Sequence, residues 1–252
     1  MPAMNVRAVA FDLDGTLYLG EQPLPGAVEV VGWCRRRGLR VLYLTNSTVR
    51  TRQQIADKLA AMGFPVAIED VYCCSNAAAR FARESGYWQV YVIGARALRA
   101  EMTAQGVPLT EEIAAADALV VGHDPEWHLE LFGGYTLAPD AAFIACNRDM
   151  TYPVGDGRRL PGCGVVVARV ERAVGRRADV VVGKPATYLL ELIERDLGFA
   201  AADVLVVGDM EESDIAMARR AGAPAALLAG ESAAGVEGAL VIESLAKLEE
   251  LL

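Results

Sequence analysis

The chain has 252 residues, well beyond the ~150 residues of a typical domain, so two domains or one domain with a large insertion are expected. Hydrophobic residues make up 53% of the sequence, which is enough for a buried core and excludes a disordered tail. The formal net charge is -9, and an acidic surface repels phosphate backbones at long range, so no nucleic-acid partner is expected. The longest segment without a charged residue, Ser85 to Ala95, is far short of the ~20 apolar residues of a membrane span. We therefore expect a cytoplasmic protein with no membrane-inserted segment.

Five cysteines and two histidines limit the metal chemistry that the chain can support. The cysteines are odd in number and form no Cys-x-x-Cys pair, so buried free thiols are favoured over disulfides or a zinc site. Two histidines are too few for a His-rich metal site. His123 follows a predicted strand and is expected to have a structural role.

The first part of the chain alternates strands with helices. Nearly continuous apolar runs predict strands at Val6–Phe11 and Arg40–Leu44, and helical periodicity predicts helices at Ala27–Arg37 and Arg52–Met62. A glycine directly follows each of these helices, where a left-handed residue commonly ends a helix.

The middle of the chain repeats this alternation on its own. Strands are predicted at Val90–Ile93, Ala118–Val121 and Phe143–Cys146. Helices are predicted at Ala95–Gln105, Glu126–Leu137 and Val165–Val174. Residues 149–162 are rich in Gly and Pro and are predicted to form a loop.

The last part of the chain predicts strands at Val180–Val182 and Val204–Val207 and helices at Thr187–Leu197 and Ser213–Ala221. Together with the first part it predicts a Rossmann-like parallel sheet with helices on both faces, an α/β fold. This core domain would comprise residues 1–78 and 178–252. Residues 79–177 would form an inserted α/β cap domain, with boundaries good to about ten residues.

Polar side chains follow four of the strands predicted for the core. The strands lead into Asp12-Leu-Asp14-Gly-Thr, Thr45-Asn46-Ser, Gly-Lys184-Pro and Gly-Asp209, the last of which is followed by Asp214. Because the carboxyl ends of parallel strands line one crevice of an open sheet, we expect these side chains to meet there.

Several carboxylates in one pocket repel one another, by ~4 kcal/mol for a pair about 4 Å apart at an effective dielectric constant of about 20. A single lysine cannot neutralise them, whereas a divalent cation can, and oxygen ligands suit Mg²⁺ rather than zinc. Mg²⁺ also shares its ligand shell with substrate phosphate. The metal, Lys184 and donors from Thr45 and Asn46 would therefore form a local phosphate site in an acidic protein.

The same residues can divide the hydrolysis of a phosphoester into two steps. A carboxylate can attack phosphorus and form an aspartyl phosphate. Asp12 and Asp14 are two residues apart and lie on the same side of an extended chain, so the second carboxylate can protonate the leaving oxygen and then activate water. The metal and Lys184 would stabilise the charge of the transferring group.

These four motifs, in this order, resemble those of the haloacid dehalogenase-like hydrolases. Residues 46–183 leave room for a large α/β cap, whereas the segment between Asp14 and Thr45 holds only a flap and one helix. That arrangement, with the sequences Asp12-Leu-Asp-Gly-Thr-Leu-Tyr-Leu-Gly and Cys146-Asn-Arg-Asp-Met-Thr-Tyr-Pro, resembles the NagD-like, 4-nitrophenylphosphatase-type branch. The resemblance covers essentially the whole chain.

The resemblance implies roles for the residues of the four motifs. Asp12 would be the nucleophile and Asp14 the general acid/base. Thr45, Asn46 and Lys184 would hold the phosphoryl group.

The resemblance also implies a metal site and a substrate contact. Mg²⁺ would be bound by the Asp12 side chain, the Asp14 backbone carbonyl and Asp209, with Asp214 in support. The cap residues that would face the leaving part of the substrate are Asn147, Arg148 and Asp149. After Asp209 the branch often has Arg or Asn, whereas this chain has Met210-Glu211-Glu212, whose extra carboxylates would alter the metal preference or the water structure of the site.

The predicted function is the hydrolysis of a small phosphorylated metabolite by a Mg²⁺-dependent phosphatase. The main alternative is a phosphotransferase or phosphomutase of the same superfamily, which would pass the phosphoryl group to a second substrate. Such members usually carry a helical cap between the first two motifs, where this chain has no room for one. A phosphoacceptor signalling module or an inactive binding protein fits the motifs less well. The sequence identifies neither the substrate nor the oligomeric state, although a homodimer is compatible with an exposed cap face.

Overall fold

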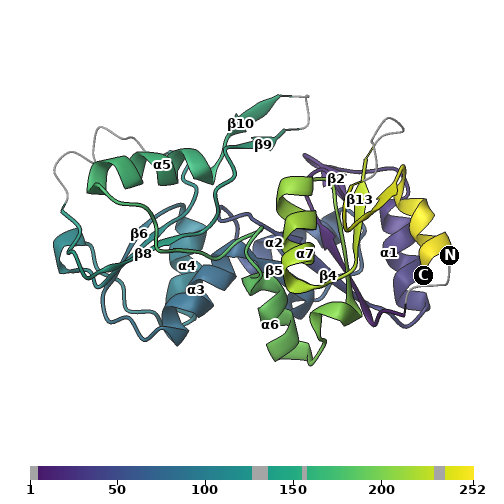
Figure 1. Cartoon of the computed structure of the whole chain (residues 1–252), viewed down its shortest axis with the longest axis horizontal. Coiled ribbons are helices and arrows are strands. Elements are labelled where there is room, and N and C mark those ends of the chain that lie inside the picture. Colours follow the sequence, from purple (N-terminus) through teal and green to yellow (C-terminus); the bar gives the residue numbers. More distant parts are fainter. Residues whose placement is uncertain (1–4, 127–135, 155–157, 230–235) are drawn as a thin grey trace.

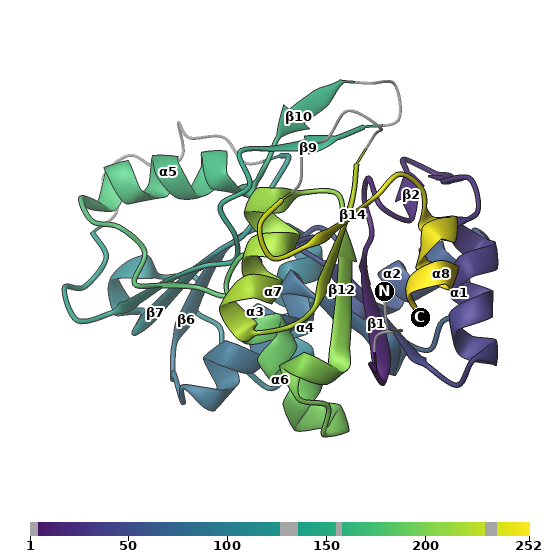
Figure 2. The ribbon, with the colours of Figure 1, turned by 45° about the vertical axis from the view of Figure 1, so that its right-hand side comes forward.

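The computed structural model describes residues 5–126, 136–154, 158–229 and 236–252, and these form two α/β units on separate parallel sheets (Figure 1). The strands of the first sheet are β1 (Ala8–Asp12), β4 (Arg40–Thr45), β5 (Val71–Cys73), β12 (Val204–Gly208), β13 (Ala225–Leu228) and β14 (Leu240–Ile242). Their spatial order is β14-β13-β12-β1-β4-β5, and every neighbouring pair is parallel. Figure 2 shows β1 and β12 side by side near the middle of this sheet.

The second sheet has four parallel strands in the order β11-β8-β7-β6. Its strands are β6 (Val90–Ile93), β7 (Ala118–Val121), β8 (Ala142–Ala145) and β11 (Val180–Val181). The predicted fold class, a parallel α/β core with an inserted α/β unit, is therefore confirmed.

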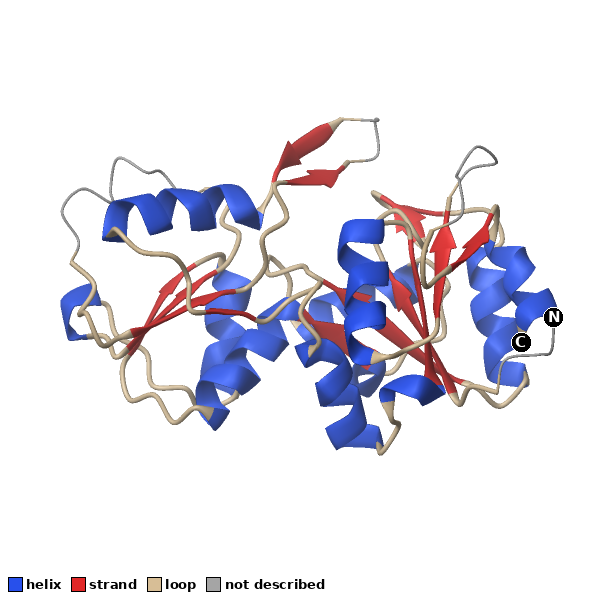
Figure 3. Ribbon diagram, viewed as in Figure 1, coloured by secondary structure: helices blue, strands red, loops and turns tan. Residues whose placement is uncertain are grey.

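Helices cover both faces of each sheet (Figure 3). The helices are α1 (Ala27–Arg36), α2 (Arg52–Ala61), α3 (Cys74–Glu84), α4 (Arg96–Ala104), α5 (Cys163–Val174), α6 (Tyr188–Leu197), α7 (Ala216–Ala221) and α8 (Leu248–Leu251). Successive residues of a strand point to opposite faces, so Val9 and Phe11 of β1 pack with α1, α2 and α8. Ala8 and Ala10 pack on the other face with α6 and α7.

The second unit has its own hydrophobic core. Helix α5 covers one face of its sheet, and α3 and α4 cover the other (Figure 1). Helix α3 also touches the first unit, because Ala78 and Ala82 pack into the second core while Ala77 packs with residues of α6. The exact positions of the domain boundaries, predicted at 78/79 and 177/178, stay a prediction.

One predicted strand belongs to the other sheet. Val180–Val182 was expected in the core sheet, but β11 pairs with β8 through Val180 and Ile144 and through Val181 and Ala145. The strand is two residues long and half-buried, so its apolar character does not specify which sheet it joins. As a result Lys184 follows a strand of the second sheet rather than a strand of the core.

Two short hairpins project beside the sheets. One hairpin, β2 (Tyr18–Leu19) with β3 (Gln22–Pro23), lies in the predicted flap. The other pairs β9 (Thr151–Pro153) with β10 (Arg159–Pro161), so the prediction that residues 149–162 form only a loop is wrong.

The predicted helix Glu126–Leu137 lies largely at residues 127–135, outside the described part of the chain. The two glycines predicted to end helices, Gly38 and Gly63, have a positive φ, as do Gly198 after α6 and Gly222 after α7. Within the described residues, no helix has the length and apolar character needed to cross a membrane.

A buried glutamate ties the second unit to a helix of the first. Glu101 of α4 is 7% exposed, and its Oε1 accepts a hydrogen bond of 2.7 Å from the backbone N–H of Arg52, the first residue of α2. Its Oε2 accepts a hydrogen bond of 2.9 Å from the side-chain amide of Asn76 on α3. The first N–H groups of a helix have no partner within the helix, so Glu101 supplies one from outside.

We expect Glu101→Ala to lower the free energy of unfolding by roughly 2–4 kcal/mol, because it leaves two buried donors unsatisfied. Thermal and urea unfolding of the two proteins would measure the difference. Glu111→Ala is the matched control, since Glu111 is 81% exposed and pairs with Arg99 at the surface. An equally small loss for both variants would show that Glu101 does not join the units.

Candidate active site

The carboxyl end of β1 carries Asp12 and Asp14, and their side chains diverge. Asp12 is buried and turns toward β12, whereas Asp14 accepts a hydrogen bond of 3.2 Å from the Tyr18 hydroxyl of the flap. Gly15 permits this turn with a φ of 99°, a left-handed conformation that other residues rarely adopt. Burial raises the pKa of the Asp14 carboxyl, against the opposing charge of Lys58.

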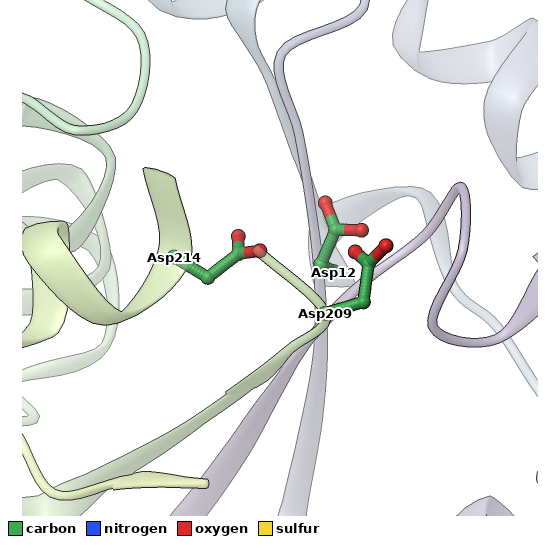
Figure 4. Close-up of side chains that lie close together, drawn as sticks. All are labelled: Asp12, Asp209 and Asp214. Atoms are coloured by element: carbon green, nitrogen blue, oxygen red, sulfur yellow. The ribbon is translucent and has the colours of Figure 1, made fainter. Parts of the chain in front are cut away.

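Asp209 and Asp214 join Asp12 in one carboxylate cluster (Figure 4). Each of the three offers an oxygen atom, and these atoms lie within 4.8 Å of one another. Asp209 directly follows β12, and Asp214 extends toward Asp12 from the helical turn Glu211–Ile215 that leads into α7. The predicted supporting residue Asp214 is therefore a full member of the cluster.

Two glycines make this close approach possible. A Cβ atom on Gly15 would lie 2.3 Å from Oδ2 of Asp209, and a Cβ atom on Gly208 would lie 2.3 Å from Oδ2 of Asp214. Neither position has space for a larger residue unless a carboxylate of the cluster moves. The glycines of these two motifs thus shape the cluster as well as the turns.

Lys184 is the cation of the cluster. It is 2% exposed, and its ammonium group donates hydrogen bonds to Oδ1 of Asp12 and, at 2.6 Å, to Oδ1 of Asp214. Burial by itself would lower the pKa of Lys184, but the two carboxylates raise it well above its ordinary value. Lys184 therefore stays protonated in the folded protein.

One ammonium group cannot balance three carboxylates. Asp209 receives a hydrogen bond of 3.3 Å from the hydroxyl of Thr16, and none of the described cations forms an ion pair with it. Burial raises the pKa of Asp209, and the charge of Asp214 raises it further. A cluster whose three carboxylates offer only oxygen ligands and outnumber its one cation fits a hard divalent cation such as Mg²⁺.

Asn46 holds the site together through its side chain. Its Nδ2 donates to the backbone carbonyl of Lys184 at 3.0 Å and to Oδ2 of Asp149 at 2.9 Å, and its Oδ1 accepts from the Lys184 N–H at 2.8 Å. Both polar atoms of the side-chain amide are thus engaged within the protein, and the role of Asn46 in holding the phosphoryl group stays a prediction. Asn46 fixes the backbone on either side of the Lys184 side chain.

Thr45 ends β4 and lines the same pocket as Asp12. Its Oγ1 accepts a hydrogen bond of 3.1 Å from the backbone N–H of Ser47. No acceptor for the Thr45 hydroxyl hydrogen is found among the described residues, so this hydrogen can be donated to a ligand.

The three predicted cap residues take different positions. Asn147 and Asp149 line the pocket, and the side-chain amide of Asn147 donates to the backbone carbonyl of Asn46 at 2.7 Å. Arg148 is exposed, pairs with Glu171 of α5 at 2.5 Å, and is not among the residues that line the pocket. The structure therefore brings two of the three to the site.

These residues form the floor of a pocket of about 380 Å³ between the two units. Several lining residues were not predicted from the sequence: Glu21, Arg50, Lys58, His123, Tyr152 and Met210. His123, expected to be structural, packs edge-on against Tyr152 with ring centres 5.5 Å apart. Glu211 and Glu212 are exposed and do not line the pocket, so they do not add charge to it directly.

Comparison with known proteins agrees with this geometry. A family model described as haloacid dehalogenase-like hydrolase matches residues 9–108, and a HAD-hydrolase-like model matches residues 181–248. Chronophin from Mus musculus is 34% identical over 231 residues, which cover 86% of this chain and 79% of chronophin. The two model matches contain the four predicted motifs, two in each.

Solved structures extend the likeness to the whole chain. The p-nitrophenyl phosphatase from Archaeoglobus fulgidus has a TM-score of 0.85 at 28% identity and covers 98% of this chain and 100% of its own. The glycerol phosphate phosphatase from Mycobacterium tuberculosis, solved in complex with magnesium, has a TM-score of 0.83 at 29% identity and covers 98% of this chain and 79% of its own. The chain belongs to the haloacid dehalogenase-like hydrolases and, within them, to the NagD and p-nitrophenylphosphatase-type phosphatases, which are phosphoric monoester hydrolases.

Proposed function

We propose that this chain hydrolyses a small-molecule phosphomonoester in two steps, with Asp12 as nucleophile, Asp14 as general acid/base and Mg²⁺ as cofactor. The observation that carries the proposal is the cluster of Asp12, Asp209 and Asp214, held by Lys184 at the floor of the pocket. This arrangement offers a nucleophile, a metal site and a fixed positive charge at one point.

In the first step an oxygen of Asp12 bonds to phosphorus while the ester oxygen leaves. Lys184 donates to Oδ1 of Asp12, and no hydrogen bond to Oδ2 is found among the described residues, so Oδ2 is the atom that can attack. Asp14 donates its proton to the leaving oxygen. The product is an alcohol and a phosphoryl group bound to Asp12.

In the second step Asp14 accepts a proton from water as the water oxygen bonds to phosphorus. The bond from phosphorus to Asp12 breaks, so inorganic phosphate leaves and the carboxylate is restored. Lys184 and the hydroxyl of Thr45 would hold the phosphoryl oxygens during both steps. Mg²⁺ bound by Asp12, Asp209 and Asp214 would add positive charge at the same oxygens.

The dimensions of the pocket favour a small substrate. A pocket of about 380 Å³ lined by residues of both units suits a phosphorylated metabolite and not a folded protein or a duplex. The names of relatives agree with this, since they include a glycerol-3-phosphate phosphatase from Gallus gallus, 33% identical over 243 residues.

We expect Asp12→Asn to lower phosphate release by at least about 10³-fold, because an amide cannot form the covalent intermediate. The measurement is phosphate release from a panel of phosphomonoesters at saturating Mg²⁺. Asp57→Asn, an exposed change on α2, is the matched control and should retain wild-type activity. Activity of Asp12→Asn within tenfold of wild type would contradict the nucleophile assignment, provided that both variants keep the wild-type circular dichroism.

The metal site makes a prediction that does not depend on turnover. If Mg²⁺ binds the folded protein, it should raise the melting temperature by an amount that grows with the logarithm of the Mg²⁺ concentration relative to Kd. Asp209→Asn should weaken Mg²⁺ binding at least about tenfold in calorimetry, because it removes one of three carboxylates of the cluster. Asp140→Asn, outside the cluster, serves as the control, and equal Mg²⁺ affinities for these two variants would place the metal elsewhere.

A further inference from the structure

Two cations in the pocket have no task in the phosphoryl transfer described above. Arg50 lies in the loop after β4, and Lys58 lies on α2. Both line the same pocket as Asp12, Asp14 and Thr45. Lys184 forms ion pairs with the carboxylate cluster, whereas among the described residues neither Arg50 nor Lys58 forms one with it.

Lys58 is buried without a good hydrogen-bond acceptor. Its side chain is 10% exposed, and its ammonium nitrogen lies 3.6 Å from Oε1 of Glu21, which is 73% exposed. The same nitrogen lies 4.0 Å from the ring centre of Tyr18. Burial lowers the pKa of Lys58, although the nearby Asp14 opposes this effect. A buried ammonium group normally has stronger partners than these.

Arg50 is fixed by its backbone while its guanidinium group has no partner. The backbone carbonyl of Arg50 accepts a hydrogen bond of 2.9 Å from the Ser75 hydroxyl. Within the described ranges, the guanidinium group forms no ion pair and donates no hydrogen bond to a protein atom. A guanidinium group has five N–H donors in a planar fork that matches a carboxylate or a phosphate.

The position of the two cations separates them from the carboxylate cluster. Lys58 lies over the ring of Tyr18, whose hydroxyl donates to Asp14, the proposed proton donor to the leaving oxygen, and Arg50 lines the same pocket. Glu21 of the flap is the other carboxylate near Lys58. The two cations therefore lie on the side of the pocket that the leaving part of the substrate would occupy.

We propose that Arg50 and Lys58 form a second anion-binding subsite that takes an acidic group on the leaving part of the substrate. The substrate class is then a phosphomonoester that carries a further carboxylate or a second phosphate. This inference rests on the proposed function, since it assumes that the phosphoryl group binds at Asp12. The acidic group supplies the hydrogen-bond acceptors that the two side chains lack in the protein.

The kinetic test uses substrates that differ in one charge. Carboxyalkyl phosphates of two to five carbons are compared with the amides of the same length, and a second arm uses the corresponding alkane bisphosphates. We expect kcat/KM to be about 10- to 100-fold higher for at least one acid than for its amide, because the amide leaves the cations unpaired. The two arms show whether a carboxylate or a phosphate is preferred.

Variants then assign the preference to the two residues. Arg50→Gln and Lys58→Met should lower kcat/KM for the acid about 10- to 100-fold, mainly through KM, and change kcat/KM for the amide less than about threefold. Arg83→Gln, an exposed change on α3, is the control and should alter neither value. Equal losses for acid and amide would assign the two cations a structural role and overturn the subsite.

A binding experiment separates this inference from the proposed function. Phosphonate analogues of one acid and its amide are titrated into wild-type protein and into Arg50→Gln by calorimetry with Mg²⁺ present. The subsite is supported if the wild type binds the acid more tightly than the amide and Arg50→Gln abolishes this difference. That result supports the subsite even if no ester is hydrolysed, and the absence of hydrolysis would then contradict the proposed function alone. Equal binding of acid and amide by the wild type overturns the subsite, and phosphate release from either ester then leaves the proposed function intact.

Discussion

The loop between β4 and α2 is the constraint on which the site depends, because both units hold it. From the second unit, the backbone N–H of His123 donates to the Thr48 hydroxyl at 2.8 Å, and Asn147 donates to the carbonyl of Asn46 at 2.7 Å. Glu101 fixes the first residue of α2 just beyond the loop. The carboxyl edge of the second sheet is thus bonded to the loop that directly follows Thr45, the residue proposed to hold the phosphoryl group.

This arrangement means that neither unit contains a complete site. Asp12 comes from the core sheet, whereas Lys184 follows β11 of the second sheet and forms ion pairs with Asp12 and Asp214. Buried ion pairs contribute little net stability because desolvation offsets their attraction, but breaking one leaves a buried charge uncompensated. The ion pairs of Lys184 therefore fix the relative position of the two units more than they stabilise the fold.

The sequence predicted the parts of the site that local patterns encode. Asp12 and Asp209 directly follow strands of the core sheet, and parallel sheets bring such residues to one edge. Local patterns do not encode which sheet the strand before Lys184 joins, because β11 is only two residues long. They also do not encode the hydrogen bonds of the Asn46 side chain, because these bonds join residues far apart in the chain. Arg50 was missed because sequence alone does not distinguish a pocket arginine from a solvated one.

The charges of the pocket explain how an acidic chain with a net charge of -9 can accept an anion. If its cations served only to balance its carboxylates, each would have a carboxylate partner at hydrogen-bonding distance, as Lys184 has. Lys58 instead lies 3.6 Å from an exposed glutamate, and Arg50 has no ion pair with any described carboxylate. A cation with weak partners is poorly compensated for its lost hydration, and an acidic group on the substrate reduces that penalty on binding. The pocket is therefore electrostatically incomplete on the side of the leaving group, where the charge it needs has to come from the substrate.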